Sequence, residues 1–199
     1  MAESGGWRPP ASLPEVAFAG RSNVGKSSLI NALVHRRKFA RVSNTPGRTR
    51  EINFFRVNDL FILADLPGYG YARISKEKRA AWRPLIEGYL KGSPALRGVV
   101  LLLDTRRSPS EDDLQMLEFL AHRETPTLVI ATKVDKLRNS EREGRLKALA
   151  KEAGVESEQI IPFSAETGEG RNELAEAIMQ LVPAAGTGDE RLGSGDPGP

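Results

Sequence analysis

The chain has 199 residues, of which 39% are hydrophobic, and it carries a formal net charge of +3 and no cysteine. This length is enough for one substantial core, and the absence of cysteine excludes disulfides and thiolate metal sites. The first ten residues show neither the basic nor the apolar segment of a secretory signal, and the longest relevant apolar run covers only residues 99–103. We therefore expect a cytoplasmic protein with no membrane span.

Short apolar runs alternate with helical patterns along the chain, which is typical of an α/β fold. Strands are predicted at residues 16–19, 51–57, 60–64, 98–103, 127–131 and 159–163, and helices at residues 26–34, 75–91, 110–123, 139–153 and 170–182. The order predicts a mostly parallel, six-stranded sheet with one antiparallel edge strand. Pro84 stands inside the predicted helix 75–91 and is expected to kink or restart it.

The two ends of the chain differ in composition from the rest. Residues 183–199 contain five Gly, three Pro and no aromatic residue, so burial cannot repay the entropy of ordering them. We expect a disordered tail over residues 183–199, a flexible extension over residues 1–13, and a single domain over residues 14–182.

The first motif joins the predicted strand 16–19 to the predicted helix 26–34. Residues 20–27 read G-R-S-N-V-G-K-S, the G-x-x-x-x-G-K-S pattern of a phosphate-binding loop, and the strand and helix that this loop requires flank it. Its backbone N–H groups and the positive end of the helix dipole would face a bound triphosphate. Lys26 would reach the β- and γ-phosphates, and the Ser27 hydroxyl would bind Mg²⁺. The pattern predicts nucleotide binding and a three-layer P-loop NTPase fold.

Two later segments could respond to the γ-phosphate. The stretch D-L-P-G follows an apolar strand, which places Asp65 toward the Mg²⁺ shell and lets the Gly68 N–H point at the γ-phosphate. Thr49 stands in the loop before the strand 51–57, where its hydroxyl could close over Mg²⁺ only when the γ-phosphate is present. Thr45 is the alternative. D-L-P-G alone would equally suit an ordinary turn, and its place in the motif order favours the nucleotide role.

The base is read from a later motif, T-K-V-D at residues 132–135, which follows a buried-strand pattern. Doubly wound sheets bind ligands at the carboxyl ends of their strands, where this motif stands. The Asp135 carboxylate can accept hydrogen bonds from the ring N–H and the exocyclic amine of guanine, whereas adenine would leave it unpaired. Lys133 can lie along the base, and the backbone N–H groups of Ser164 and Ala165 can reach the guanine carbonyl. The motif alone also suits a solvated turn, but behind a phosphate loop it predicts guanine.

These elements in this order make the chain similar to the translation-factor class of GTPases. The strings PEVAFAGRSNVGKSSLIN, TPGRTREINFF, DLPGYGYA, TKVDK and FSAETGEG extend the resemblance to the EngB family, also called YihA or YsxC, in the TrmE-Era-EngA-EngB-septin-like class. The resemblance spans residues 14–182. It implies a Ras-like G domain that hydrolyses GTP to GDP and phosphate with Mg²⁺, and a role in large ribosomal subunit assembly and in normal cell division and septation.

The motifs and the resemblance together give the expected site residues. For catalysis these are Lys26, Thr49 and Gly68, and for Mg²⁺ they are Ser27 and Thr49, with Asp65 acting through water. The expected GTP contacts are Gly20, Arg21, Ser22, Asn23, Val24, Gly25, Lys26, Ser27, Gly47, Arg48, Thr49, Arg50, Glu51, Asp65, Leu66, Pro67, Gly68, Thr132, Lys133, Val134, Asp135, Ser164 and Ala165.

The expected reaction is in-line attack of water on the γ-phosphate, with Lys26, Mg²⁺ and backbone N–H groups stabilising the charge. Tyr69 stands where Ras-like enzymes have a water-orienting Gln, so we expect the isolated protein to hydrolyse GTP slowly. Asn23 stands where related GTPases hold a potassium ion near the phosphates. A turn stabilised by the Asn23 side chain is the alternative role.

Charge is unevenly distributed along the chain. Residues 36–97 contain 14 Lys and Arg against 5 Asp and Glu, whereas residues 98–199 contain 12 against 19. The basic half includes both segments that could respond to the γ-phosphate, the loop with Thr49 and the stretch from D-L-P-G onward, which we call the switch segments. Solvated helix faces and compensation of the nucleotide charge explain part of the surplus, and the rest favours an anionic partner such as the ribosomal RNA of a large-subunit precursor.

Two other functions remain open at this point. One is a division-related GTPase that acts through a protein partner and makes no RNA contact. The other is a P-loop kinase, which would require an acceptor site and a lid that the sequence does not show. For the ribosomal and the division-related GTPase alike, we expect a monomer that binds GTP or GDP.

Overall fold

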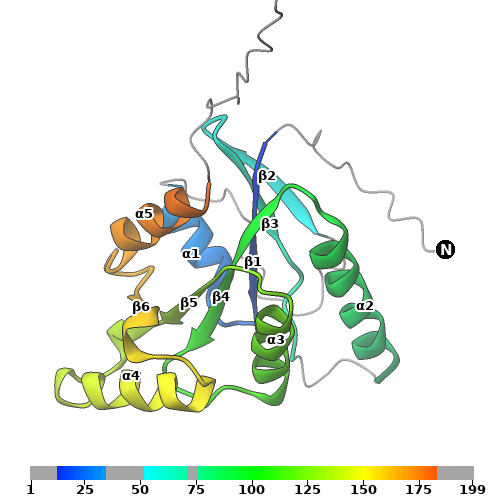
Figure 1. Cartoon of the computed structure of the whole chain (residues 1–199). Coiled ribbons are helices and arrows are strands. Elements are labelled where there is room, and N and C mark those ends of the chain that lie inside the picture. Colours follow the sequence, from blue (N-terminus) through cyan, green and yellow to red (C-terminus); the bar gives the residue numbers. More distant parts are fainter. Residues whose placement is uncertain (1–12, 35–51, 71–75, 183–199) are drawn as a thin grey trace, which may run out of the picture.

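The computed structural model describes residues 13–34, 52–70 and 76–182 (Figure 1). In chain order its elements are β1 (Glu15–Gly20), α1 (Lys26–Leu33), β2 (Asn53–Val57), β3 (Phe61–Asp65), α2 (Lys76–Gly92), β4 (Leu96–Asp104), α3 (Glu111–His122), β5 (Thr127–Thr132), the 3₁₀ turn η1 (Val134–Lys136), α4 (Asn139–Ala153), the 3₁₀ turn η2 (Ser157–Gln159), β6 (Ile160–Phe163) and α5 (Arg171–Leu181). Within these ranges, no helix combines the length and the apolar character needed to cross a membrane.

The six strands form one sheet in the order β2-β3-β1-β4-β5-β6. β3, β1, β4, β5 and β6 run parallel, and β2 pairs antiparallel with β3 at the edge, as predicted. Because the parallel strands all end at the same side, the loops that follow them gather along one edge of the sheet. This carboxyl edge carries every sequence motif that lies in the described residues.

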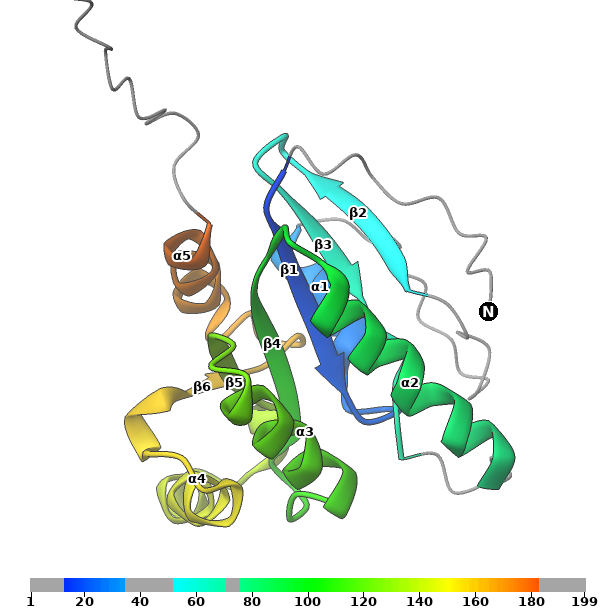
Figure 2. The same ribbon diagram turned by 45° about the vertical axis from the view of Figure 1, so that its right-hand side comes forward.

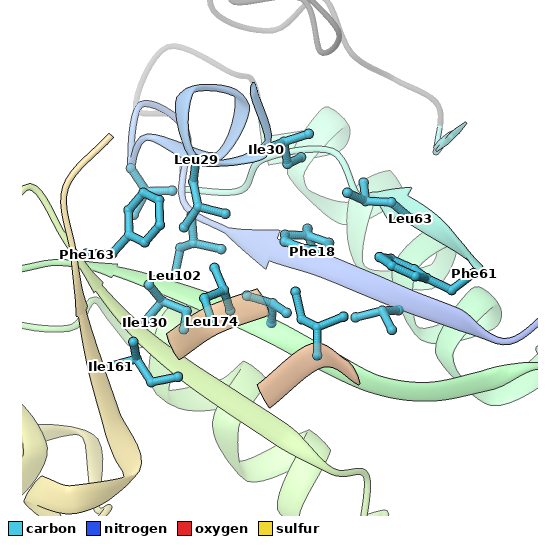
Figure 3. Packing of buried hydrophobic residues seen from close by; sticks show 14 of the residues in the cluster. Phe18, Leu29, Ile30, Phe61, Leu63, Leu102, Ile130, Ile161, Phe163 and Leu174 are labelled. Atoms are coloured by element: carbon cyan, nitrogen blue, oxygen red, sulfur yellow. The ribbon is translucent and has the colours of Figure 1, made fainter. Parts of the chain in front are cut away.

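Successive side chains of β1 point to opposite faces of the sheet, and helices cover both faces (Figure 1 and Figure 2). Val16 and Phe18 pack with residues of α1 and α5, whereas Ala17 and Ala19 pack with residues of α2 and α3. Figure 3 shows the first cluster, in which large apolar side chains from five strands meet those of the two helices. A third cluster lies under α4 and includes Leu149. The buried strands therefore form the central layer of three.

Each predicted strand and helix is present, with ends that differ by no more than two residues over the described ranges. Pro84 does not restart α2, which runs without a break from Lys76 to Gly92. Burial of Ile86, Tyr89 and Leu90 holds this part of the helix against the sheet and offsets the roughly 3 kcal/mol that an internal proline costs. The turns η1 and η2 were not predicted, because three residues are too few to show a periodic pattern.

The core assignment predicts different costs for two leucines on helices. Leu174 on α5 is fully buried in the cluster of Figure 3, whereas Leu114 on α3 is 41% exposed. Leu174→Ala should lower the free energy of unfolding by about 2–5 kcal/mol, because it removes packed atoms and leaves a cavity. Leu114→Ala has the same change in helix propensity but should cost less than about 1 kcal/mol. Urea unfolding followed by circular dichroism measures both, and equal losses would contradict the assignment.

Candidate nucleotide site

The phosphate loop leaves β1 at Gly20 and enters α1 at Lys26. A Cβ on Gly20 would lie only 3.0 Å from Val24 and 3.1 Å from Leu102, so the loop starts where little more than glycine fits. Further on, Asn23 has a φ of 65° and Gly25 a φ of 108°. Both values are in the left-handed region that glycine adopts readily and asparagine tolerates. Asn23 therefore stands at a turn of the backbone, and both roles considered for its side chain stay predictions.

Lys26 and Asp65 meet at the carboxyl edge from different elements. The Lys26 ammonium at the start of α1 contacts the Asp65 Oδ1 at the end of β3, and the two side chains are only 11% and 9% exposed. Ser27 follows in the first turn of α1. A carboxylate and a hydroxyl are hard oxygen donors of the kind that Mg²⁺ prefers. The residues at this point thus fit the expected partners of a magnesium-bound phosphate group.

The base loop is hydrogen-bonded to the phosphate loop. The Thr132 hydroxyl donates to Val24 O at 2.7 Å, and Lys133 Nζ donates to Asn23 O at 2.6 Å. Lys133 itself has a φ of 64°, which turns the chain directly after β5. The structure therefore brings the T-K-V-D motif and the phosphate loop into one site, although they are more than 100 residues apart in sequence.

Asp104, the last residue of β4, belongs to this site although no motif indicated it. Its carboxylate accepts hydrogen bonds from Arg106 Nε at 2.9 Å and Arg106 Nη2 at 2.7 Å, and Lys133 Nζ lies 2.8 Å from Oδ2. Burial alone would raise the pKa of Asp104, but the hydrogen bonds from Arg106 and Lys133 outweigh it and hold this pKa well below its usual value. The ionised carboxylate fixes the Lys133 side chain. In the sequence, the available signal for Asp104 was its position as an acidic residue at the end of a buried apolar run.

Arg145 on α4 is a second residue that sequence reasoning missed. Its guanidinium donates to Thr105 O at 2.7 Å and to Arg107 O at 2.6 Å. The buried Thr105 hydroxyl in turn donates to Thr132 O at 2.8 Å. α4 thus supports the loop after β4, and that loop supports the base loop. No local spacing shows such a contact, because it depends on how two elements pack.

Asp135 is oriented by its neighbours. Ser164 Oγ donates to Asp135 Oδ1 at 2.7 Å, and Lys136 Nζ lies 3.0 Å from Oδ2. Burial would raise the pKa of Asp135, but the hydrogen bond from Ser164 and the contact with Lys136 lower it below its ordinary value. Asp135 is therefore a carboxylate at neutral pH, which is the form that accepts two hydrogen bonds from a guanine edge.

Ser164 is buried and does more than contact Asp135. Its Oγ accepts the backbone N–H groups of Glu166 at 3.2 Å and Thr167 at 3.1 Å, which shapes the loop after β6. Its own N–H donates to Glu169 O at 3.1 Å. This removes Ser164 as the expected N–H partner of the guanine carbonyl. The exposed Ala165 keeps that expectation.

The segment after β3 continues beside the phosphate loop. Leu66 N–H donates to Phe18 O at 3.0 Å, and Ser22 Oγ donates to Gly68 O at 3.3 Å. Pro67 lies buried between these contacts. The structure thus places Asp65, Leu66, Pro67 and Gly68 at the same edge as residues 20–27 and 132–135.

One predicted segment cannot be compared. Gly47, Arg48, Thr49, Arg50 and Glu51, together with the alternative Thr45, lie outside the described residues. Their roles stay predictions. The remaining expected site residues all lie at the carboxyl edge, at the ends of β1, β3 and β5, at the start of α1, and in the loops after β1, β3, β5 and β6.

Comparison with known proteins shows what the chain resembles. A family described as 50S ribosome-binding GTPase matches residues 15–133. The probable GTP-binding protein EngB of Gemmatimonas aurantiaca is 62% identical over 182 residues, which cover 92% of this chain and 89% of that protein. EngB of Desulforamulus reducens is 50% identical over 179 residues, which cover 89% of this chain and 87% of that protein. A crystal structure of a probable GTP-binding protein engB has a TM-score of 0.70 at 28% identity, and the match covers 84% of this chain and 97% of that one. The chain therefore belongs to the EngB family of GTP-binding proteins, within the family of 50S ribosome-binding GTPases.

Proposed function

We propose that this protein is a GTP-operated switch that hydrolyses GTP slowly with Mg²⁺ and acts in large ribosomal subunit assembly, with a consequence for cell division and septation. The observation that carries the nucleotide part is the pair of hydrogen bonds from Thr132 to Val24 and from Lys133 to Asn23. They set the base loop beside the phosphate loop. A nucleotide with its phosphates on residues 20–27 would then have its base next to Asp135.

The chemistry follows from the charged groups at the carboxyl edge. In the nucleotide complex we expect the Lys26 side chain to turn from Asp65 to the phosphates, because the phosphates carry more negative charge than one carboxylate and lie closer to the phosphate loop. Ser27 and Thr49, with Asp65 acting through water, would hold Mg²⁺, which would neutralise charge on the phosphates. Lys26 and the Gly68 N–H stabilise the charge that develops as water attacks in line. A potassium ion near Asn23 remains a prediction.

Two observations support the ribosomal part. The family description names the 50S ribosome, and the basic surplus of residues 36–97 falls on the half of the chain with the switch segments. Phosphate contacts with RNA would then supply affinity without sequence readout. We propose a cytoplasmic monomer with a large-subunit precursor as its partner. Action through a division protein without RNA contact is the alternative.

Asp135→Asn tests the assignment of the base. An asparagine amide mismatches the guanine edge and matches xanthine, where an oxygen replaces the exocyclic amine. We expect GDP affinity to fall by about 100-fold or more and xanthosine diphosphate affinity to rise. Calorimetry with both nucleotides measures this. Asp59→Asn, at an exposed turn with a φ of 57° that asparagine tolerates, is the matched control. Wild-type GDP affinity in Asp135→Asn would refute guanine reading.

Ser164→Ala tests whether Asp135 must be oriented. The substitution removes the donor to Asp135 and the acceptor of two backbone N–H groups. Each lost hydrogen bond costs about 1 kcal/mol, so we expect GDP affinity to fall by about tenfold. Ser157→Ala on the exposed turn η2 is the control. An unchanged dissociation constant in the same calorimetric titration would show that Asp135 needs no such partner.

Nucleotide-dependent binding to large-subunit precursors tests the ribosomal part. Because the basic surplus lies on segments that the γ-phosphate is expected to order, binding should be tighter with a non-hydrolysable GTP analogue than with GDP, and should fall steeply with salt. Charge reversal of Arg36, Arg37 and Lys38 to Glu should weaken cosedimentation without changing GDP affinity. Reversal of the exposed residues Arg138, Lys147 and Lys151 in the acidic half is the control. Binding that ignores nucleotide, salt and both reversals would favour the division-partner alternative.

A further inference from the structure

The residue after D-L-P-G has no role in the proposed chemistry, yet its placement is specific. Tyr69 is 2% exposed and packs in the core cluster on the side of α2 and α3, with Ala19, Leu66 and Met116. Its ring therefore belongs to the core. A residue that orients water would instead reach toward the phosphates.

The glycines on either side of Tyr69 allow the backbone to approach the phosphate loop. A Cβ on Gly68 would lie 3.1 Å from Ser22 Oγ, and a Cβ on Gly70 would lie 2.9 Å from the Arg21 side chain. Between them, Tyr69 O accepts the Ser22 N–H at 2.8 Å, and Tyr69 pairs with Arg21 as a parallel β-bridge. The G-Y-G sequence thus forms a short extension of the sheet along the phosphate loop.

The side chain of Tyr69 lies near a buried carboxylate on α3. Asp113 is 5% exposed, and its Oδ2 accepts Ser110 N–H at 2.8 Å and Ser110 Oγ at 2.7 Å in the N-terminal cap of the helix. The other oxygen, Asp113 Oδ1, is buried and accepts no hydrogen bond within the described residues, and Asp113 lies near enough to Tyr69 for its charge to act on the tyrosine. Burial first, and then the charge of the nearby Asp113, raise the pKa of Tyr69 well above its ordinary value. The hydroxyl is therefore protonated at neutral pH and can donate to Asp113.

We propose that Tyr69 is a positioning residue for GTP hydrolysis, because its buried ring, packed in the core near Asp113, and its backbone bridge to Arg21 anchor residues 68–70 against the phosphate loop and so set the place of the Gly68 N–H. The contacts from Ser22 and Arg21 engage the carbonyl oxygens of residues 68–70, so none of them occupies that N–H. A donor fixed in advance stabilises developing charge without reorganisation. The anchor should therefore act on kcat more than on nucleotide affinity. This inference rests on the proposed GTPase activity.

Tyr69→Phe removes the hydroxyl and keeps the ring. Its matched control is Tyr89→Phe, which also removes a buried hydroxyl; this one donates to a buried carboxylate, Glu15, at 2.8 Å. Glu15 begins β1, at the end of the strand away from the phosphate loop. On the full chain we expect Tyr69→Phe to lower kcat of GTP hydrolysis by about tenfold with GDP affinity within about twofold of wild type. Tyr89→Phe should leave both unchanged, whatever it does to stability.

Two further measurements separate positioning from packing. If Tyr69→Phe and Asp113→Asn break the same contact, the double variant should be no slower than the slower single variant. Tyr69→Ala should also speed hydrogen exchange of the Ser22 amide, because that N–H donates to Tyr69 O. The exchange is read without nucleotide turnover and so reports the anchor itself.

Three results would overturn the inference. Equal kcat losses in Tyr69→Phe and Tyr89→Phe would make Tyr69 a packing residue only. Faster hydrolysis by Tyr69→Gln would show that a water-orienting side chain matters and the anchor does not. Wild-type turnover in both Tyr69→Phe and Asp113→Asn would refute the anchor while leaving the proposed GTPase intact. Failure of the wild-type protein to hydrolyse GTP, by contrast, would refute the proposed function itself.

Discussion

The carboxyl edge of the sheet depends on hydrogen bonds that neighbouring loops make to the backbone of the phosphate loop. Thr132 and Lys133 donate to the carbonyls of Val24 and Asn23, and Ser22 N–H donates to Tyr69 O. A loop that turns its N–H groups toward a ligand leaves other backbone groups to be satisfied by protein. The base loop and the segment after β3 supply those partners, so neither can shift without disturbing the phosphate loop.

Charge placement at this edge follows a similar logic. Lys26 pairs with Asp65 and Lys133 with Asp104, and all four side chains are at least partly buried. Such pairs contribute little net stability, because desolvation offsets most of their attraction. Their value under the proposed function is to hold a cation and a carboxylate ready beside the phosphates and the base. The pairing of Lys133 also fixes its aliphatic stem where a guanine ring is expected to lie.

Sequence reasoning predicted most of the fold because buried parallel strands appear as apolar runs and the motifs stand at their ends. For the same reason it predicted that Lys26, Asp65 and Asp135 lie at the same edge of the sheet. It could not predict Asp104 or Arg145, whose roles depend on packing between the loop after β4 and α4. Sequence reasoning also could not predict the burial of Tyr69. A tyrosine between two glycines is typical of a turn, and its burial depends on packing against the distant helix α3.

A side chain in the position of Tyr69 cannot both pack beneath the phosphate loop and reach an attacking water. The buried ring and the close approach at Gly68 and Gly70 commit this chain to the first arrangement. Under the proposed function, the segment after β3 then contributes a fixed backbone N–H, and orientation of water must come from another group. A bound partner is the natural source, because it would dock against the basic half of the chain, which contains the switch segments. Slow hydrolysis in isolation and faster hydrolysis in a complex would thus have one structural cause, the commitment of Tyr69 to the core.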